Sequence, residues 1–194
     1  MERLGLRADR FIIAHISNLK GIKRTSYIVA SACEVVRREP RSTYIVVGDG
    51  NCREHMEAEC RRLGIIDHFR FVGWVDHEDV ADYINLADAV VMPSETEAMA
   101  LVYLETQACG RLLIASDIPA AREVLRDGEN GLLFRKGDSA DLTRKILLAA
   151  NDPALRDRIG AVARERVKQY DLNHFVAAYD RVIRGVARKR RVPV

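Results

Sequence analysis

Short apolar runs alternate with helical segments along most of this chain. The runs occupy residues 11–16, 43–47, 69–72, 88–92, 112–115 and 132–134. Between and after them, apolar residues recur at helical spacing around 28–36, at 52–63, 78–87 and 101–108, around Glu123, and at 139–150 and 153–170. Such an order predicts an α/β fold with a parallel sheet of about six strands and helices on both faces.

The chain has 194 residues, a length that fits one domain or one domain with a tail. We predict a domain over 1–170, in which Met1 to Arg10 resembles the end of a linker. From Asp171 a new helical rhythm begins. Its apolar positions are Leu172, Phe175, Val176, Tyr179, Val182, Ile183 and Val186. This pattern predicts one amphipathic helix, capped by Asp171, followed by a basic tail to residue 194.

Composition excludes several classes of protein. No apolar run is long enough to span a membrane, and the N-terminus lacks an apolar signal region. The four cysteines show no C-x-x-C spacing, so we expect reduced thiols in a cytoplasmic protein rather than disulfides or a zinc site. Four histidines, at 55, 68, 77 and 174, are scattered without metal-ligand spacing. Residues 181–191 carry six positive charges, without which the net charge of +3 becomes −3.

The segment from Pro93 to Gly110 follows an apolar run and carries two carboxylates. In a doubly wound sheet, ligands bind outside the carboxyl ends of the strands, where a helix start presents N–H groups that suit phosphate. Glu97 and Glu105 flank that start, and carboxylates accept hydrogen bonds from sugar or ribose hydroxyls. The residues alone predict a phosphate site flanked by two carboxylates. They also allow Glu97 to cap the helix and Glu105 to face solvent.

The same segment, PSETEAMALVYLETQACG, resembles the E-x7-E region of the retaining glycosyltransferases of family 4, which have the two-domain GT-B fold. That region usually reads P-S-x-x-E-G-F-G-L-V-x-L-E, and Glu97 and Glu105 fall at its two Glu positions. The likeness runs from about Phe11 to Tyr170 and includes SDIPAAREVLRDGENGLLF, similar to the family's S-D-x-x-x-x-x-E-x-x-x-D-G-x-N-G-x-L. It implies a Rossmann-like, nucleotide-sugar-binding domain, the C-terminal half of a GT-B enzyme.

Residues 17–24, SNLKGIKR, resemble the family loop G-R-L-x-x-x-K-G, which supplies an Arg and a Lys to the donor diphosphate. Lys23 falls on that Lys, Asn18 falls on that Arg, and Arg24 replaces the second Gly. In a subset that reads S-N-F-R-x-V-K-R, Lys20 stands where Arg is expected, and it offers a point charge without the bidentate fork of Arg. Taken alone, the segment also fits a solvated basic turn.

Three other stretches have weaker matches. Gly73-Trp74-Val75 follows a strand where the family's F-x-G loop holds the base, so Trp74 and Val75 are candidate base contacts, with a core position as the alternative for Trp74. Gly48-Asp49-Gly50 matches the family's G-D-G, and we interpret it as a turn rather than a phosphate cradle. His15 ends the first strand, and we interpret it as a structural residue rather than a ligand.

The resemblance implies transfer of a hexose-type sugar from a nucleoside-diphosphate sugar with net retention, without an obligate metal or another cofactor. Lys20, Lys23 and the helix amides would stabilise the leaving diphosphate. Glu97 would hold donor-sugar hydroxyls, and Glu105 would hold the ribose hydroxyls. The remaining candidate donor contacts at the helix start are Ala98, Met99, Ala100, Leu101 and Val102.

Ala98, Met99 and Ala100 depart from the family's G-F-G. Alanine keeps the N–H but restricts φ and adds a methyl group, so amide contacts can survive while the sugar pocket changes shape. Two other functions stay open: a non-catalytic nucleotide-sugar-binding module, and a GT-B-like nucleotide-sugar epimerase. The E-x7-E spacing after P-S is typical of transferases. A plain phosphate-binding α/β domain is the remaining alternative.

The partners expected are a nucleotide-sugar donor and the family's N-terminal acceptor domain, which is missing from this sequence; no nucleic acid is expected. An excised or truncated half should bind donor but scarcely transfer, because transfer needs an acceptor held at the anomeric carbon. The final GT-B helix crosses to the N-terminal domain, so Val182, Ile183 and Val186 should be exposed or covered by a second copy. The basic end, Arg188 to Arg191, suits peripheral contact with anionic lipid at the inner face of the membrane.

Overall fold

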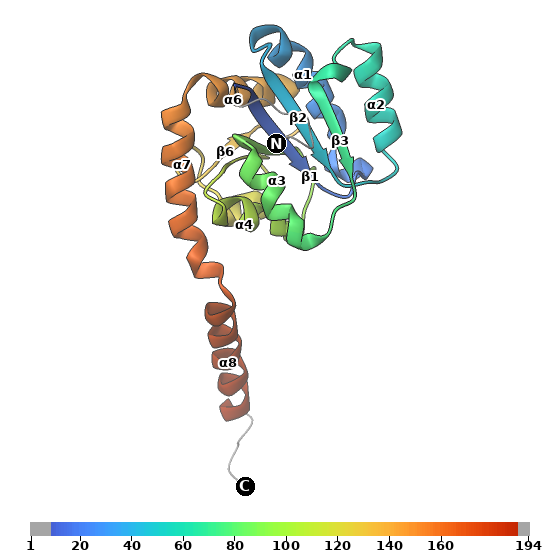
Figure 1. The fold of residues 1–194 in the computed structure, drawn as a ribbon. Coiled ribbons are helices and arrows are strands. Elements are labelled where there is room, and N and C mark those ends of the chain that lie inside the picture. The colour runs from blue at the N-terminus through green and yellow to red at the C-terminus, as the bar shows by residue number, and fades with distance from the viewer. Residues whose placement is uncertain (1–8, 190–194) are drawn as a thin grey trace.

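The fold is a single six-stranded parallel sheet between two layers of helices (Figure 1). A computed structural model describes residues 9–189, with side chains as far as residue 186. The strands are β1 (Phe11–Ile16), β2 (Ser42–Val47), β3 (Phe69–Gly73), β4 (Ala89–Met92), β5 (Leu112–Ser116) and β6 (Leu132–Phe134). Their order is β3-β2-β1-β4-β5-β6, and each lies within one residue of its predicted bounds. The predicted Rossmann-like fold class is confirmed.

Both faces of the sheet are buried, which explains why the strands are continuous apolar runs. In β1, Phe11 and Ile13 pack into one hydrophobic cluster, whereas Ile12 and Ala14 pack into the other. All six residues of β1 are buried. Because successive side chains of a strand point to opposite faces, each central strand contributes to two cores at once.

One core lies under helices α1 (Thr25–Arg38), α2 (Arg53–Arg62), α6 (Ser139–Asn151) and α7 (Pro153–Arg166). The other lies under α3 (Val80–Leu86), α4 (Leu101–Ala108) and α5 (Pro119–Val124). Side chains of Asp138 and Asp152 cap α6 and α7 by accepting backbone N–H bonds. The helices predicted at 78–87 and 153–170 are each part 3₁₀, with η4 (His77–Asp79) before α3 and η5 (Val167–Tyr170) after α7.

Helix α8 (Leu172–Lys189) extends away from the domain beyond α7 (Figure 1). Asp171 caps it as predicted, since its Oδ1 accepts the backbone N–H of His174 at 2.8 Å. The predicted exposure of Val182, Ile183 and Val186 is confirmed at 65%, 61% and 52%. We expected exposure only near the last turns, but it begins at Leu172 in the first turn. The whole helix lies beyond the sheet and its covering layers.

Parts of two predicted segments lie outside the described residues: most of the expected linker, residues 1–8, and the basic end at 190–194.

No helix in the described part of the chain combines the length and apolar character needed to cross a membrane.

Candidate functional site

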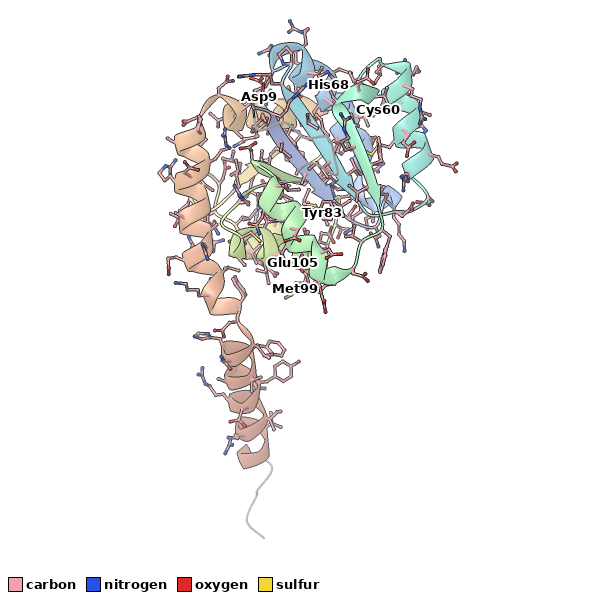
Figure 2. All side chains as sticks on the ribbon, in the orientation of Figure 1. Asp9, Cys60, His68, Tyr83, Met99 and Glu105 are labelled. Carbon is pink, nitrogen blue, oxygen red and sulfur yellow. The ribbon has the colours of Figure 1, made fainter. Side chains whose placement is uncertain are left out.

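The strand order reverses between β1 and β4, which pair in parallel. In open α/β sheets this switch point is where ligands bind, in the crevice outside the carboxyl ends of the strands. The loop at 17–24 follows β1, and the loop at 93–100 follows β4. Figure 2 shows Met99 and Glu105 at this end of the domain, opposite Asp9 and His68 at the amino end. The two predicted donor loops therefore meet at one edge of the sheet.

The connection after β2 holds the first loop in place. Gly48 has a φ of 113°, and a Cβ added there would lie 1.9 Å from the carbonyl oxygen of Ser17. A Cβ at Gly50 would lie 2.6 Å from the carbonyl oxygen of Leu19. The Leu19 N–H donates to the carbonyl of Asp49 at 2.9 Å. Gly48 forms an isolated bridge with Gly73, and residues 49–50 continue as an irregular connection into a turn at 51–52, so the predicted turn begins later than Gly48. The two glycines allow this connection and the first loop to approach closely.

Lys23 and Glu97 form the central contact of the site. Lys23 ends the 3₁₀ turn η2 (Gly21–Lys23), and its Nζ donates to Glu97 Oε1 at 2.6 Å. The two side chains are only 15% and 10% exposed. Two candidates that lie 74 residues apart in the sequence are therefore in direct contact. A largely buried ion pair of this kind is a preformed electrostatic element rather than a solvated surface pair.

A second ion pair, which the sequence did not reveal, lies beside the first. Arg24 Nη2 is 2.6 Å from Glu95 Oε1, and the Glu95 N–H donates to the Ile22 carbonyl at 3.0 Å. Arg24 adopts a left-handed conformation, with φ 48° and ψ 46°. Such a conformation explains why a glycine suits this position in the resembled motif. That mismatch was the available signal, although its partner was not evident from the sequence.

His15 is a structural histidine, as interpreted. Its Nδ1 lies 2.8 Å from the Val91 carbonyl oxygen, and its Nε2 lies 2.8 Å from Ser17 Oγ. A carbonyl can only accept, so Nδ1 carries the proton and Nε2 accepts from the Ser17 hydroxyl. Burial lowers the pKa of His15 to about 4, so the ring is neutral at pH 7. It braces the end of β1 against β4 without adding charge.

The start of α4 carries the segment that departs from the family motif. Ala100 is extended, with φ −89° and ψ 101°, and α4 begins at Leu101. Ala98, Met99 and Ala100 all have negative φ, so alanine is unstrained at both former glycine positions. Met99 and Leu101 are exposed, while Val102 is partly buried. The departure from G-F-G therefore requires no strained backbone, and what it adds is a methyl group at Ala98 and another at Ala100.

A buried amide network fixes the direction of α4. The side chain of Asn130, in the turn before β6, donates from Nδ2 to Gln107 Oε1 at 2.9 Å and to the Val124 carbonyl at 2.8 Å. Asn130 Oδ1 accepts the N–H of Arg126 at 2.6 Å. Asn130 and Gln107 are almost fully buried. A satisfied buried network of this kind holds its element rigidly, and here it orients the helix that carries Glu105.

The candidate base contacts lie on the other side of β1. Trp74 is 72% exposed, so the alternative that placed it in the core is wrong. Trp74, Val75 and Asn18 line a hollow of about 220 Å³ between the ends of β1, β2 and β3. The remaining lining residues are Ile16, Ser17, Val47, Gly48, Asp49 and Val80. Asn18 falls on the family's diphosphate-binding Arg in the sequence comparison, but in the structure it lies beside the candidate base contacts.

Glu105 and Lys20 are less constrained than Lys23 and Glu97. Burial raises the pKa of the Glu105 carboxyl, and the His77 imidazole, with Nε2 3.7 Å from Glu105 Oε1, lowers it in part. His77, which we regarded as scattered, thus lies beside a candidate ligand. Lys20 is exposed and forms no ion pair with any described residue. Within residues 9–189, no group of three or more His, Cys, Asp and Glu side chains could hold a metal.

Comparison with known families shows to which family the chain belongs. The family described as glycosyl transferases group 1 matches residues 1–166. The chain belongs to this family.

Two curated relatives show how much of such a protein the chain represents. Alpha-D-kanosaminyltransferase of Streptomyces kanamyceticus is 31% identical over 161 residues, which are 81% of this chain and 41% of the relative. D-inositol 3-phosphate glycosyltransferase of Kribbella flavida is 31% identical over 176 residues, 86% of this chain and 42% of the relative. The chain thus spans about two fifths of the length of these proteins.

Solved structures share the fold. Sucrose-phosphate synthase of Thermosynechococcus elongatus superposes with a TM-score of 0.88 at 26% identity, over 97% of this chain and 48% of that one. HepE of Anabaena, in complex with UDP-glucose, gives 0.80 at 25% identity, over 87% and 46%. The C-terminal domain of LpcC, a group 1 glycosyl transferase of Francisella tularensis, gives 0.75 at 22% identity, over 84% and 87%. The domain is therefore of the type found in GT-B glycosyltransferases.

Proposed function

We propose that this chain is the donor-binding half of a retaining, family 4 glycosyltransferase that moves a hexose-type sugar from a nucleoside-diphosphate sugar to an acceptor. The observation that carries the proposal is the Lys23–Glu97 pair at the switch point of the sheet. It places a cation suited to phosphate against a carboxylate suited to hydroxyls. A phosphorylated sugar presents both groups next to each other.

In this proposal the diphosphate lies against Lys23, with Lys20 as a second cation and the first N–H groups of α4, at Leu101 and Val102, as further donors. When the glycosidic bond to the diphosphate breaks, negative charge accumulates on the leaving phosphate. Preorganised cations and amides aimed at that oxygen stabilise the transition state more than the ground state. Glu97 accepts hydrogen bonds from the sugar hydroxyls and fixes the anomeric carbon.

The nucleoside end extends toward the hollow beside Trp74 and Val75. The backbone and the indole there present a flat, apolar surface to a base, and Glu105 accepts the ribose hydroxyls. Support for a UDP-hexose as one donor to test comes from HepE, which was solved with UDP-glucose. In this proposal, residues around this hollow select the base.

Acceptor binding belongs to another part of the full-length enzyme. The relatives are about twice as long as this chain, and α8 exposes an apolar face of seven residues. We infer that this face packs on the acceptor-binding domain, which precedes this one in the family, and that an isolated domain self-associates through it. The basic C-terminal end would then contact anionic lipid at the cytoplasmic face of a membrane.

Calorimetry with UDP, GDP and ADP, each alone and as its glucose conjugate, tests the proposal directly. We expect one diphosphate to bind and its sugar conjugate to bind more tightly, because Glu97 adds contacts to the sugar. If none of the six ligands binds, the proposal is wrong. Sugar transfer by the full-length protein then separates an enzyme from a non-catalytic binding module.

A further inference from the structure

We propose that the Arg24–Glu95 pair is a positioning device that keeps the two donor loops in register while a diphosphate draws Lys23 away from Glu97. The inference rests on the proposed function, because it assigns the diphosphate to Lys23. Arg24 itself does not contact the ligand in this proposal. It acts through the backbone that carries Lys23 and Glu97.

The geometry gives the two ion pairs different surroundings. Adjacent residues of one loop, Lys23 and Arg24, contact Glu97 and Glu95 of the other loop, each at 2.6 Å. The inner pair is 15% and 10% exposed, whereas the outer pair is 43% and 34% exposed. Glu95 of the outer pair also donates its backbone N–H to the Ile22 carbonyl at 3.0 Å. Three ties therefore join the loops, and only the inner one uses a group assigned to the ligand.

In this proposal, donor binding breaks the Lys23–Glu97 ion pair. The Lys23 ammonium donates to Glu97 in the structure. A diphosphate competes for that ammonium with strong, charged acceptors. When Lys23 turns toward phosphate, Glu97 becomes free to accept sugar hydroxyls, but the loops lose their buried ion pair. The outer pair and the Ile22 bond then have to preserve the spacing between the diphosphate and sugar contacts.

The backbone of Arg24 supports a dedicated role for its side chain. A φ of 48° is disfavoured for residues with a Cβ, and glycine adopts it without penalty. Arg24 is the one non-glycine residue with positive φ among residues 9–189. The chain thus maintains an unfavourable backbone conformation at the position that sends a guanidinium to Glu95. For stability alone, glycine would serve this position at least as well.

The test compares Arg24→Gly and Arg24→Lys with the parent, and uses Arg38→Ala as the matched control. Arg24 precedes the first residue of α1, whereas Arg38 is the last; Arg38 is also exposed and also paired with a glutamate, Glu34. Losing either arginine changes the net charge equally. The readouts are the Kd for UDP, GDP and ADP, the melting temperature, and hydrogen exchange of the Glu95 amide measured without ligand.

For Arg24→Gly we expect the Kd of the bound diphosphate to rise about fivefold, the upper end of the effect of an exposed ion pair. Its melting temperature should stay within about 4 °C of the parent, because relief of the left-handed backbone offsets the lost pair. Exchange of the Glu95 amide should accelerate. Arg24→Lys should restore most of the affinity, and Arg38→Ala should change neither the Kd nor the exchange.

Unchanged affinity in Arg24→Gly, or an equal loss in Arg38→Ala, would overturn the inference. So would a larger fall in melting temperature, which would indicate a general structural role. If the parent binds none of UDP, GDP and ADP, alone or as glucose conjugates, the proposed function fails at that step, and the part of the inference that involves a diphosphate fails with it. Exchange at Glu95 needs no ligand: an unchanged rate in Arg24→Gly shows that the pair does not hold the loops.

Discussion

The two sides of the candidate site are built differently. On the side that we propose binds the diphosphate, called the phosphate side, two ion pairs and a backbone hydrogen bond join the loops at 17–24 and 93–97. On the other side, which we propose binds the nucleoside, Trp74 is largely exposed. Glu105 there has one salt-bridge partner among the described residues, His77, whose Nε2 lies 3.7 Å from Glu105 Oε1. One side is preorganised, and the other is open.

This difference indicates a division of labour between affinity and selectivity. Preorganised charges cost little reorganisation when a diphosphate binds, so the phosphate side should supply most of the binding free energy. The open side contacts the groups that differ between nucleotides, so it should determine which nucleotide is chosen. Five substitutions or treatments can break or sharpen this comparison.

The largest effect should come from the scaffold of the phosphate side. Gly48→Ala places a Cβ 1.9 Å from the Ser17 carbonyl oxygen at a φ of 113°. We expect the free energy of unfolding to fall by about 3 kcal/mol and nucleotide binding to be lost. Gly21→Ala is the control, because a Cβ there meets no atom within 4 Å. Denaturant unfolding measures the stability of both variants. Equal stabilities would show that the segment from Gly48 to Gly50 does not support the loop.

Lys23→Ala should weaken binding of the diphosphate by about 1.5–3 kcal/mol, the cost of a charge-assisted contact. Lys20→Ala removes the same charge from the same loop, yet Lys20 is exposed and unpaired with described residues, so its effect should be smaller. Titration calorimetry compares the three proteins. If the two substitutions weaken binding equally, the ammonium of Lys23 has no special position, and the preorganised side acts only as a general positive charge.

On the open side, Trp74→Ala should cost about 1 kcal/mol of affinity, because a stacked base loses its aromatic partner. The loss should depend on the base and should be absent for inorganic pyrophosphate. Exposure of Trp74 predicts no loss of thermal stability. Equal losses for UDP, GDP and pyrophosphate would show that Trp74 acts on the phosphate side, contrary to the comparison.

Glu105→Gln should weaken ribonucleotide binding by about 1 kcal/mol while the fold stays intact. The parent should bind the 2′-deoxy ligand less well than the ribonucleotide, and the mutant should discriminate much less. Burial raises the pKa of Glu105 above its ordinary value, so protonation begins at a higher pH than for an exposed carboxyl. Discrimination by the parent should therefore decline on acidification, at a higher pH than for an ordinary carboxyl. Equal discrimination in both proteins would place the carboxylate elsewhere.

Much of this arrangement could be predicted because it depends on periodicity and on strand ends. Short continuous apolar runs predicted all six strands. Parallel strands then bring the loops that follow them, such as those with Lys23 and Glu97, to one edge of the sheet. The cap at Asp171 followed from local chemistry. These features depend on the local sequence and on the topology of one sheet.

The remainder depends on side-chain placement between distant segments. Arg24 was visible as a mismatch, but its pairing with Glu95 required the spacing of two loops from different strands. An apolar residue after a loop glycine fits either a core or a pocket, so the exposure of Trp74 could not be decided. Exposure of α8 from its first turn depends on where the helix leaves the domain, which its own periodicity does not encode.

The smallest effect should be that of metal removal. A diphosphate can be neutralised by a divalent cation or by protein cations, and here Lys23 and the start of α4 occupy the phosphate side. Because the loops supply their own positive charge, EDTA should leave the Kd for the bound nucleoside diphosphate unchanged, and added Mg²⁺ should not tighten it. Calorimetry before and after chelation measures this, with Lys23→Ala as a sensitised control, since a metal could replace its lost charge. A clear loss with EDTA in the parent would mean that the phosphate side is completed by a cation, and the contrast between the two sides would then lie in metal binding rather than in preorganised side chains.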